Sequence, residues 1–308
     1  MAENFELMRV EIGDRTYGVL RRDMQSVQHG NRVRVKPSGS NPPAVLPTTQ
    51  GNLAVYSLGD MLGVSHQVAF NRQRVLVLYS RWGLWGLTVD RINQWELIDS
   101  AEFQPFPLVA NPGKKRQYQY VLTRNDEMLL ILNPTELHPY ADHEERQEET
   151  VEDVPLPEAI QRRGQLVLFT PAGLQEQADT LALGFVPKQI DEVLRESTLH
   201  PVPSAPSDVH GLLNWRGQAV PVIDLAARFG LRDGTHDLSD AQRVVVVRGT
   251  ATNRPIGFFA RASIDFLNLP IPHAPVDIPA DFPSSLLHGI ADYDGRMVLI
   301  PKLDPLAT

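Results

Sequence analysis

The most constraining feature of this 308-residue sequence is an internal repeat. Four blocks of the first half recur in the same order in the second half, and the offset between matching residues stays between 166 and 169 positions. A shared order at a nearly constant offset predicts two copies of one domain. The matching blocks are Thr16–Val27 with Ala182–Val193, Ser57–Gly63 with Asp224–Gly230, Gln73–Leu78 with Gln242–Val247, and Met128–Leu137 with Met297–Leu306.

Each copy has the pattern of a series of short strands. Short apolar runs are separated by turn-forming residues, and helical periodicity is nearly absent. This pattern predicts an all-β protein built from small barrels or sandwiches, and it disfavours alternating β-α units. The clearest predicted strands of the first copy are Ala54–Tyr56, Arg74–Tyr79, Trp85–Val89 and Met128–Leu132.

A charged segment with several prolines separates the two copies. Between Asp142 and Asp153 lie seven acidic residues and one arginine. Such a segment buries too little apolar surface to offset its chain entropy, so we expect an exposed linker. Its histidines lie beside carboxylates, but a solvated charge run offers no rigid geometry for a metal. The predicted organisation is a first domain over residues 1–138, a linker over 139–163 and a second domain over 164–308.

Composition and motifs argue against several classes of function. The absence of cysteine removes disulfide and thiolate chemistry and favours a reducing cytosol. The net charge of −8 comes mostly from the linker, so no nucleic-acid partner is expected. Neither a signal peptide nor direct membrane insertion is expected, because no segment has the required apolar run. No nucleophile elbow, phosphate-binding loop or zinc-binding helix motif is present, so we expect no enzyme activity and no cofactor.

Residues 209–231 carry the most distinctive pattern of the second copy. They predict a strand, a tight turn over residues 214–217 and a second strand that contains Pro221. Since proline cannot donate to a ladder, we expect a bulge or an unpaired position there. Asp224 is placed to cap a short helix that Gly230 ends.

The order of these residues resembles the hallmark of the CheW family, the coupling proteins of bacterial chemotaxis. The family pattern contains a glycine, an asparagine, an arginine-glycine pair and then proline-valine-isoleucine-aspartate-leucine, and it runs here from Gly211 to Leu225. The resemblance covers Gln165–Leu306 well and the first copy only weakly. It implies that each copy consists of two small five-stranded SH3-like barrels with a short helix and a hydrophobic seam between them.

The resemblance also implies a binding site and partners. In the family an acidic residue on the strand matching 190–193 lies near the arginine of the turn, which places Glu192 beside Arg216. The implied function is that of a non-enzymatic cytoplasmic adaptor, recruited to membrane receptor arrays. Its implied partners are a chemoreceptor cytoplasmic tail and the regulatory domain of a CheA-type histidine kinase. The implied partner-binding residues are Ile190, Glu192, Val193, Asn214, Trp215, Arg216 and Gly217.

Two questions stay open from the sequence. The pair of Glu192 and Arg216 either only fastens two strands together or holds the turn so that Asn214 and Trp215 face a partner. The tandem chain is either the adaptor described above or a structural or regulatory element of another two-component pathway, such as one controlling pili or surface motility. In that second hypothesis the first copy holds the second in place.

The first copy lacks the distinctive charged residues. An offset of 166 places Ser26 at the position of Glu192 and Gln50 at the position of Arg216, so both members of the pair are absent together. Ser57, which can still cap a helix, stands where the second copy has an aspartate. We therefore expect the first copy to keep the fold and to have lost or changed the usual binding surface.

Overall fold

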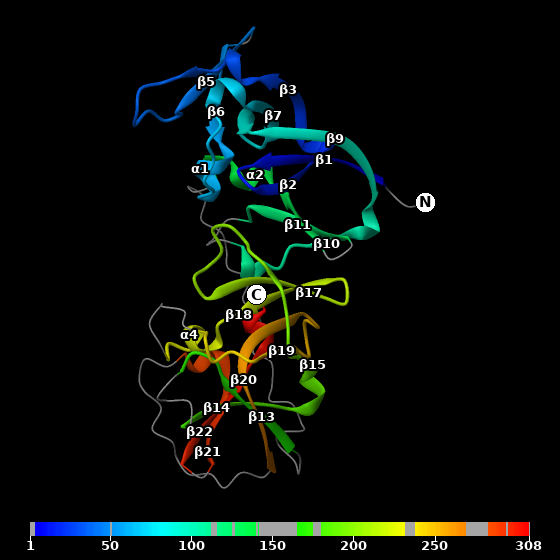
Figure 1. The fold of residues 1–308 in the computed structure, drawn as a ribbon, viewed down its shortest axis with the longest axis vertical. Coiled ribbons are helices and arrows are strands. Elements are labelled where there is room, and N and C mark those ends of the chain that lie inside the picture. The colour runs from blue at the N-terminus through cyan, green and yellow to red at the C-terminus, as the bar shows by residue number, and fades with distance from the viewer. Residues whose placement is uncertain are drawn as a thin grey trace.

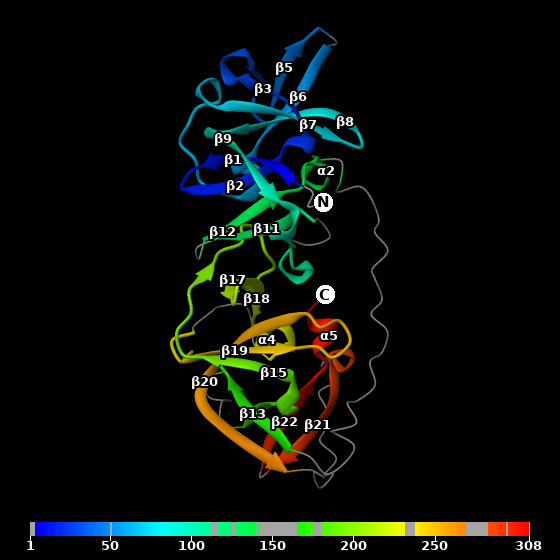
Figure 2. The ribbon, with the colours of Figure 1, turned by 90° about the vertical axis from the view of Figure 1, so that its right-hand side faces the viewer.

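The protein is elongated, and its two copies lie end to end along the long axis (Figures 1 and 2). The computed structural model describes residues 4–49, 51–111, 116–124, 127–139, 141, 165–174, 180–231, 238–268, 283–293 and 295–307. Short strands dominate this part of the chain, which confirms the all-β prediction. None of the helices in these ranges is long and apolar enough to cross a membrane.

The first copy, called repeat 1, forms two six-stranded sheets. Its strands are β1 (Asn4–Ile12), β2 (Arg15–Leu20), β3 (Met24–His29), β4 (Arg34–Val35), β5 (Ala44–Thr48), β6 (Gly51–Ser57), β7 (Arg74–Ser80), β8 (Gly83–Val89), β9 (Arg91–Asp99), β10 (Phe103–Pro105), β11 (Tyr118–Arg124) and β12 (Glu127–Leu132), and its α-helices are α1 (Leu58–Leu62) and α2 (Pro134–Leu137). One sheet, called the hairpin lobe, has the order β4-β5-β6-β8-β7-β3. The other, called the end lobe, has the order β10-β11-β12-β2-β1-β9.

The second copy, repeat 2, has the same topology with its two lobes joined. Its strands are β13 (Gln165–Pro171), β14 (Leu181–Phe185), β15 (Ile190–Leu194), β16 (Leu199–His200), β17 (Val209–Trp215), β18 (Gln218–Ile223), β19 (Arg243–Arg248), β20 (Pro255–Asn268), β21 (Leu287–Tyr293) and β22 (Arg296–Pro301), and its α-helices are α4 (Leu225–Arg228) and α5 (Leu303–Leu306). The hairpin lobe runs β16-β17-β18-β20-β19-β15, and the end lobe runs β20-β13-β14-β22-β21. The 14-residue strand β20 therefore belongs to both lobes.

Local sequence signals produce the expected elements. The four strands predicted for repeat 1 lie within β6, β7, β8 and β12. The carboxylate of Asp224 caps α4, because its Oδ1 accepts a hydrogen bond from the Ala227 amide at 3.0 Å. Gly230 follows the helix with a φ of 69°, the left-handed conformation of a helix stop. The predicted linker lies outside the described residues except at positions 139 and 141.

Each lobe is a curled sheet of five or six strands, and no strand pairing in the described chain closes one into a ring. In the hairpin lobe of repeat 2, β15 and β17 lie near opposite ends of the strand order. Glu192 on β15 nevertheless contacts Trp215 on β17. The sheet therefore curls back on itself, and side chains rather than a strand ladder join its ends.

The two repeats share apolar clusters, which the sequence did not predict. Val202 and Leu212 of repeat 2 are buried in the same cluster as Phe106 and Tyr118 of repeat 1. Val109 of repeat 1 is buried in a cluster formed mainly by repeat 2. This junction joins the end lobe of repeat 1 to the hairpin lobe of repeat 2, as β11 above β17 and β18 shows in both views (Figures 1 and 2).

Hydrogen bonds fix the register of this junction. Gln104 on β10 uses both ends of its side-chain amide: Nε2 donates to the Gly217 carbonyl, and Oε1 accepts from the Ala219 amide at 3.0 Å. Ser204 donates from its hydroxyl to the Leu62 carbonyl at 3.0 Å. The β17–β18 hairpin therefore has its own lobe on one face and repeat 1 on the other.

Candidate functional site

The candidate site is built on the β17–β18 hairpin of repeat 2. Trp215 pairs with Gln218, so Arg216 and Gly217 form a two-residue turn. Both turn residues have positive φ, 53° and 81°, as a type I′ turn requires. The side-chain oxygen of Asn214 accepts a hydrogen bond from the Gly217 amide at 3.1 Å. The asparagine and the arginine-glycine pair thus set the geometry of the turn.

Gly211 has a steric role in the same hairpin. The register of β17 shifts between Val209 and Gly211, where φ reaches 142°. A Cβ at this position would lie 2.6 Å from the carbonyl oxygen of His200 on β16, so only glycine allows the two strands to approach. The shift lies beside Pro221, and β18 meets β20 only from Val222 onward. Pro221 itself stays in register with Leu212, and it is unpaired only on the side that faces β20.

One carboxylate on β15 ties the turn to the opposite end of the sheet. The indole Nε1 of Trp215 donates to Oε2 of Glu192 at 2.8 Å, and Nη2 of Arg216 lies 2.9 Å from the same oxygen. The guanidinium of Arg216 also lies 5.1 Å from the centre of the Trp215 ring. The contact between Glu192 and Arg216 expected from the sequence is therefore present. The hydrogen bond from Trp215, together with the charge of Arg216, lowers the pKa of Glu192.

Trp215 is a core residue, and its indole lies on the buried side of the hairpin. Its side chain is 7% exposed and packs in a cluster with Leu213 and Val220. Leu213 and Trp215 are two positions apart on a strand and therefore face the same side of the sheet. Arg216 is the outward residue, with 69% of its side chain exposed, and Glu192 is intermediate at 34%. From the buried side of the sheet, the indole of Trp215 holds the carboxylate of Glu192 in place.

The remaining predicted site residues lie on the edge strand β15. Among the described strands β15 pairs only with β19, so its other edge carries no strand. Ile190 and Val193 are half-buried against the core of repeat 2. Backbone groups on such an edge can pair with an added strand. The predicted residues thus form two groups, the β15 edge and the hairpin tip, which the contacts of Glu192 connect.

Sequence reasoning missed a second arginine beside the site. The guanidinium of Arg248 on β19 lies 5.6 Å from the centre of the Trp215 ring. Its Nε donates to the carboxylate of Asp191 at 2.8 Å. Trp215 is therefore in contact with two guanidinium groups, a favourable arrangement for an indole. The register between β15 and β19 brings Asp191 to Arg248, and no short-range pattern in the sequence specifies that register.

The turn of repeat 1 corrects one sequence assignment. Thr48 pairs with Gly51, which reproduces the two-residue turn of repeat 2. Thr49 therefore matches Arg216, and the prediction that Gln50 does so is wrong; Gln50 itself lies outside the described residues. The sequence comparison used the offset of 166 from the first matching block. In the hairpin the offset between matching residues is 167, as the match of Thr49 with Arg216 shows. Threonine carries no charge, so repeat 1 lacks the charge pair under either alignment.

Repeat 1 has an open cleft where repeat 2 has its indole. Ser26 remains the match of Glu192, because each follows a register shift at the same place in its strand. Thr48 occupies the position of Trp215, and a cleft of about 650 Å³ lies there, with Leu46 among its lining residues. Repeat 1 therefore keeps the topology of the hairpin lobe without its anchoring residues.

Fold and site together define a tandem of two β-sheet repeats, each of two curled lobes, with a charged hairpin site in the second repeat. The model of the CheW-like domain matches residues 6–140 and 174–308, which is most of the chain. This chain therefore belongs to the CheW-like domain family, and each of its repeats is one such domain. The first repeat, which resembles the family only weakly by its motifs, is matched over its full length.

Curated relatives agree with this assignment. The chemotaxis protein CheW of Rhizobium meliloti (strain 1021) is 32% identical over 110 residues, which is 34% of this chain and 66% of that protein, just under two thirds of its length. The chemotaxis protein CheW of Thermotoga maritima is 25% identical over 133 residues, 43% of this chain and 85% of that protein. A solved structure, the scaffolding protein TtCheW from Thermoanaerobacter tengcongensis, aligns with a TM-score of 0.40 at 16% identity, over 44% of this chain and 94% of that one.

Proposed function

We propose that this protein is a non-enzymatic scaffold that couples the cytoplasmic tail of a chemoreceptor to the regulatory domain of a CheA-type histidine kinase. It acts in the cytoplasm at membrane receptor arrays. Membership of the CheW-like family and the names of the curated relatives support a role in chemotaxis. The observation that carries the proposal is the arrangement of Glu192, Trp215 and Arg216 in repeat 2.

This arrangement suits a docking surface because it combines a rigid support with an exposed charge. Trp215 is buried and fixes Glu192, and Glu192 in turn holds the exposed guanidinium of Arg216. A pre-positioned guanidinium loses less side-chain entropy when it binds a partner. The adjacent β15 edge adds backbone groups that a partner strand can use.

Binding measurements on the full chain test the proposal. We expect Arg216→Ala to weaken binding of the kinase regulatory domain or the receptor fragment by about tenfold or more, because a central arginine is a typical hot spot. The same change should leave the melting temperature nearly unaltered, since the side chain is mostly exposed. Thr49→Ala, at the matching position of repeat 1, is the control and should change neither quantity.

A double-mutant cycle with Glu192→Ala separates a contact from a fastener. A pair that only fastens two strands couples in the folding measurement and not in the binding measurement. Were Arg216→Ala to fold normally and bind both fragments with the original affinity, the assignment of this site would be wrong.

The junction favours one part of the second hypothesis, that repeat 1 holds repeat 2 in place. Gln104 bonds directly to the backbone of the hairpin at Gly217 and Ala219, so repeat 1 restrains the strands that carry the site. This positioning role is compatible with chemotaxis and with another two-component pathway. Titration against kinase fragments of both kinds distinguishes the pathways, because a scaffold for pili or motility would bind only its own kinase.

A further inference from the structure

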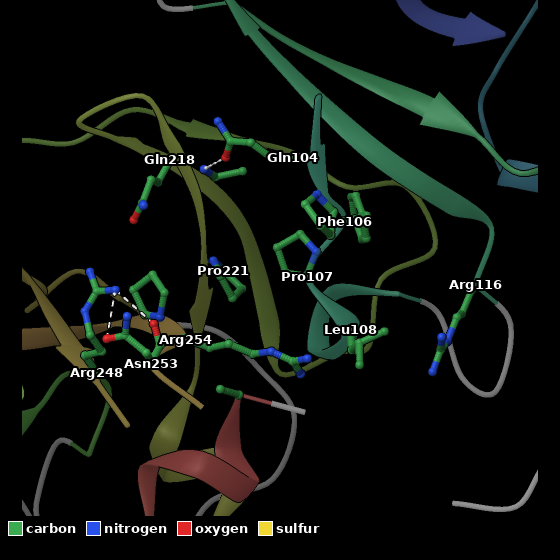
Figure 3. A pocket seen from close by; sticks show the side chains of 14 residues that line it. Gln104, Phe106, Pro107, Leu108, Arg116, Gln218, Pro221, Arg248, Asn253 and Arg254 are labelled. Atoms are coloured by element: carbon green, nitrogen blue, oxygen red, sulfur yellow. Dashed lines mark hydrogen bonds between the residues drawn. The ribbon is translucent and has the colours of Figure 1, made fainter. Parts of the chain in front are cut away.

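A cleft of about 700 Å³ lies between the two repeats, beside the hairpin (Figure 3). Residues 104–108 and Arg116 of repeat 1 form one wall. The other wall comes from β18 and from the turn between β19 and β20, which carries Asn253 and Arg254. Neither repeat forms this cleft alone, so it is a property of the tandem chain. Its size is typical of a ligand-binding site.

The charged residues of the cleft are all basic. Arg116, Arg248 and Arg254 line it, and no aspartate or glutamate does. Arg248 is partly neutralised by Asp191, and its Nη1 donates to the Asn253 carbonyl at 2.9 Å, so its position is fixed. Arg254 is exposed and has no ion-pair partner among the described residues. The cleft is therefore a local positive region in a chain whose net charge is −8.

Both walls of the cleft also contribute apolar surface. Phe106 and Pro221 are buried there, and Pro107, Leu108 and Pro255 are half-buried. Figure 3 shows Arg254 reaching across the cleft toward the wall that carries Leu108. A free inorganic anion would leave this apolar surface unused. An extended peptide can place a carboxylate on Arg254 and apolar side chains on the apolar surface.

We propose that this cleft binds a short acidic segment of a partner protein, with a carboxylate at Arg254 and its apolar side chains against Phe106 and the prolines. Guanidinium groups match the planar geometry of carboxylates, and charge complementarity therefore identifies the partner as acidic. Because the segment contacts both repeats, its binding also stabilises the junction. The proposal does not depend on the kinase or receptor contact proposed above.

The test uses the full chain and a short labelled peptide that alternates glutamate with leucine. Fluorescence anisotropy should show saturable binding that weakens as ionic strength rises. The peptide with glutamine in place of glutamate should not bind. Arg254→Glu should weaken binding of the acidic peptide by about tenfold or more, because it replaces an attraction by a repulsion.

Arg34→Glu provides the matched control, since Arg34 is an exposed arginine on β4 in the other lobe of repeat 1. It makes the same change in net charge and should leave the affinity for the peptide unaltered. Equal losses in Arg254→Glu and Arg34→Glu would overturn the proposal, because the attraction would then be non-specific. Unchanged affinity in Arg254→Glu would overturn it as well.

The acidic linker of the chain is the alternative occupant, and the same assay separates it from a partner. Seven acidic residues lie between positions 142 and 153. If the peptide binds only after these residues are changed to their amides, the chain's own linker fills the cleft and the assignment to a partner is wrong. Parallel titration of the kinase fragment distinguishes the cleft from the hairpin site at Arg216. Arg254→Glu should leave the affinity for the kinase fragment intact.

Discussion

Leu212→Ala should loosen the junction between the repeats without unfolding either of them. Leu212 is fully buried, and the cluster around it comes mostly from repeat 1. Truncation of a buried leucine to alanine costs about 2–5 kcal/mol, and a junction that can partly close over the gap belongs near the lower part of that range. A loss of about 3 kcal/mol corresponds to roughly a hundredfold change in the equilibrium between the packed and the opened junction.

Hydrogen exchange of the Ala219 amide reports this opening directly. That amide donates to the side chain of Gln104 across the junction, so it becomes exposed when the repeats separate. We expect its exchange to accelerate by roughly a hundredfold in Leu212→Ala, in line with the energy above. The amide of Val245, in the core of repeat 2, should keep its protection.

Leu213→Ala is the matched control for this experiment. Leu213 is the next residue on the strand and nearly as buried, but it packs inside repeat 2 with Trp215 and Val220. Its truncation should accelerate exchange at Val245 and leave the opening reported by Ala219 unchanged. If both substitutions accelerate exchange at both amides equally, the junction opens only when a repeat unfolds. That result would refute the reasoning.

Two further predictions concern the linker and the pH dependence of the site. Limited proteolysis should cut first within 139–163, and the two fragments should then elute together in size-exclusion chromatography because the junction holds them; separate elution would argue against the buried junction. Since the pKa of Glu192 is lowered in the folded protein, its contribution to stability is present above its ordinary value of 4.5 and is lost as the pH falls through the lower folded pKa. The difference in melting temperature between the parent protein and Glu192→Gln should therefore shrink toward acid, and a difference that grows toward acid would contradict the assigned partners.

The sequence predicted the strands and the hairpin well because these depend on local signals. Asp224 and Gly230 mark the helix in a window of a few residues, and the internal offset finds the repeat without any structure. The place of Trp215 stayed open because the turn fixes its neighbours but not the face of the sheet on which the indole lies. That face follows from strand alternation once Leu213 is known to be in the core. Sequence comparison paired Gln50 with Arg216 because a single offset ignores a one-residue change between blocks.

Long-range arrangement lay beyond any pattern in the chain. The pairing of Arg248 with Asp191 depends on the register of β15 against β19. The contact of Gln104 with the hairpin joins residues 113 and 115 positions apart, and a single glutamine carries no sign of its partner. Both contacts result from how curled sheets pack, which is a property of whole lobes and not of segments.

The junction changes how a partner can reach the site in repeat 2. The outer face of the β17–β18 hairpin is covered by repeat 1, so Leu212 and Val202 would be exposed if repeat 2 were separated from it. The parts of the site that repeat 1 leaves open are the β15 edge, which carries no further strand among the described residues, and the exposed tip at Arg216. Repeat 1 has lost the anchoring residues of its own hairpin, but its end lobe limits this access and supplies one wall of the basic cleft. The absence of the anchoring residues from one copy is thus compatible with a direct part for that copy in shaping the site and the cleft beside the other copy's hairpin.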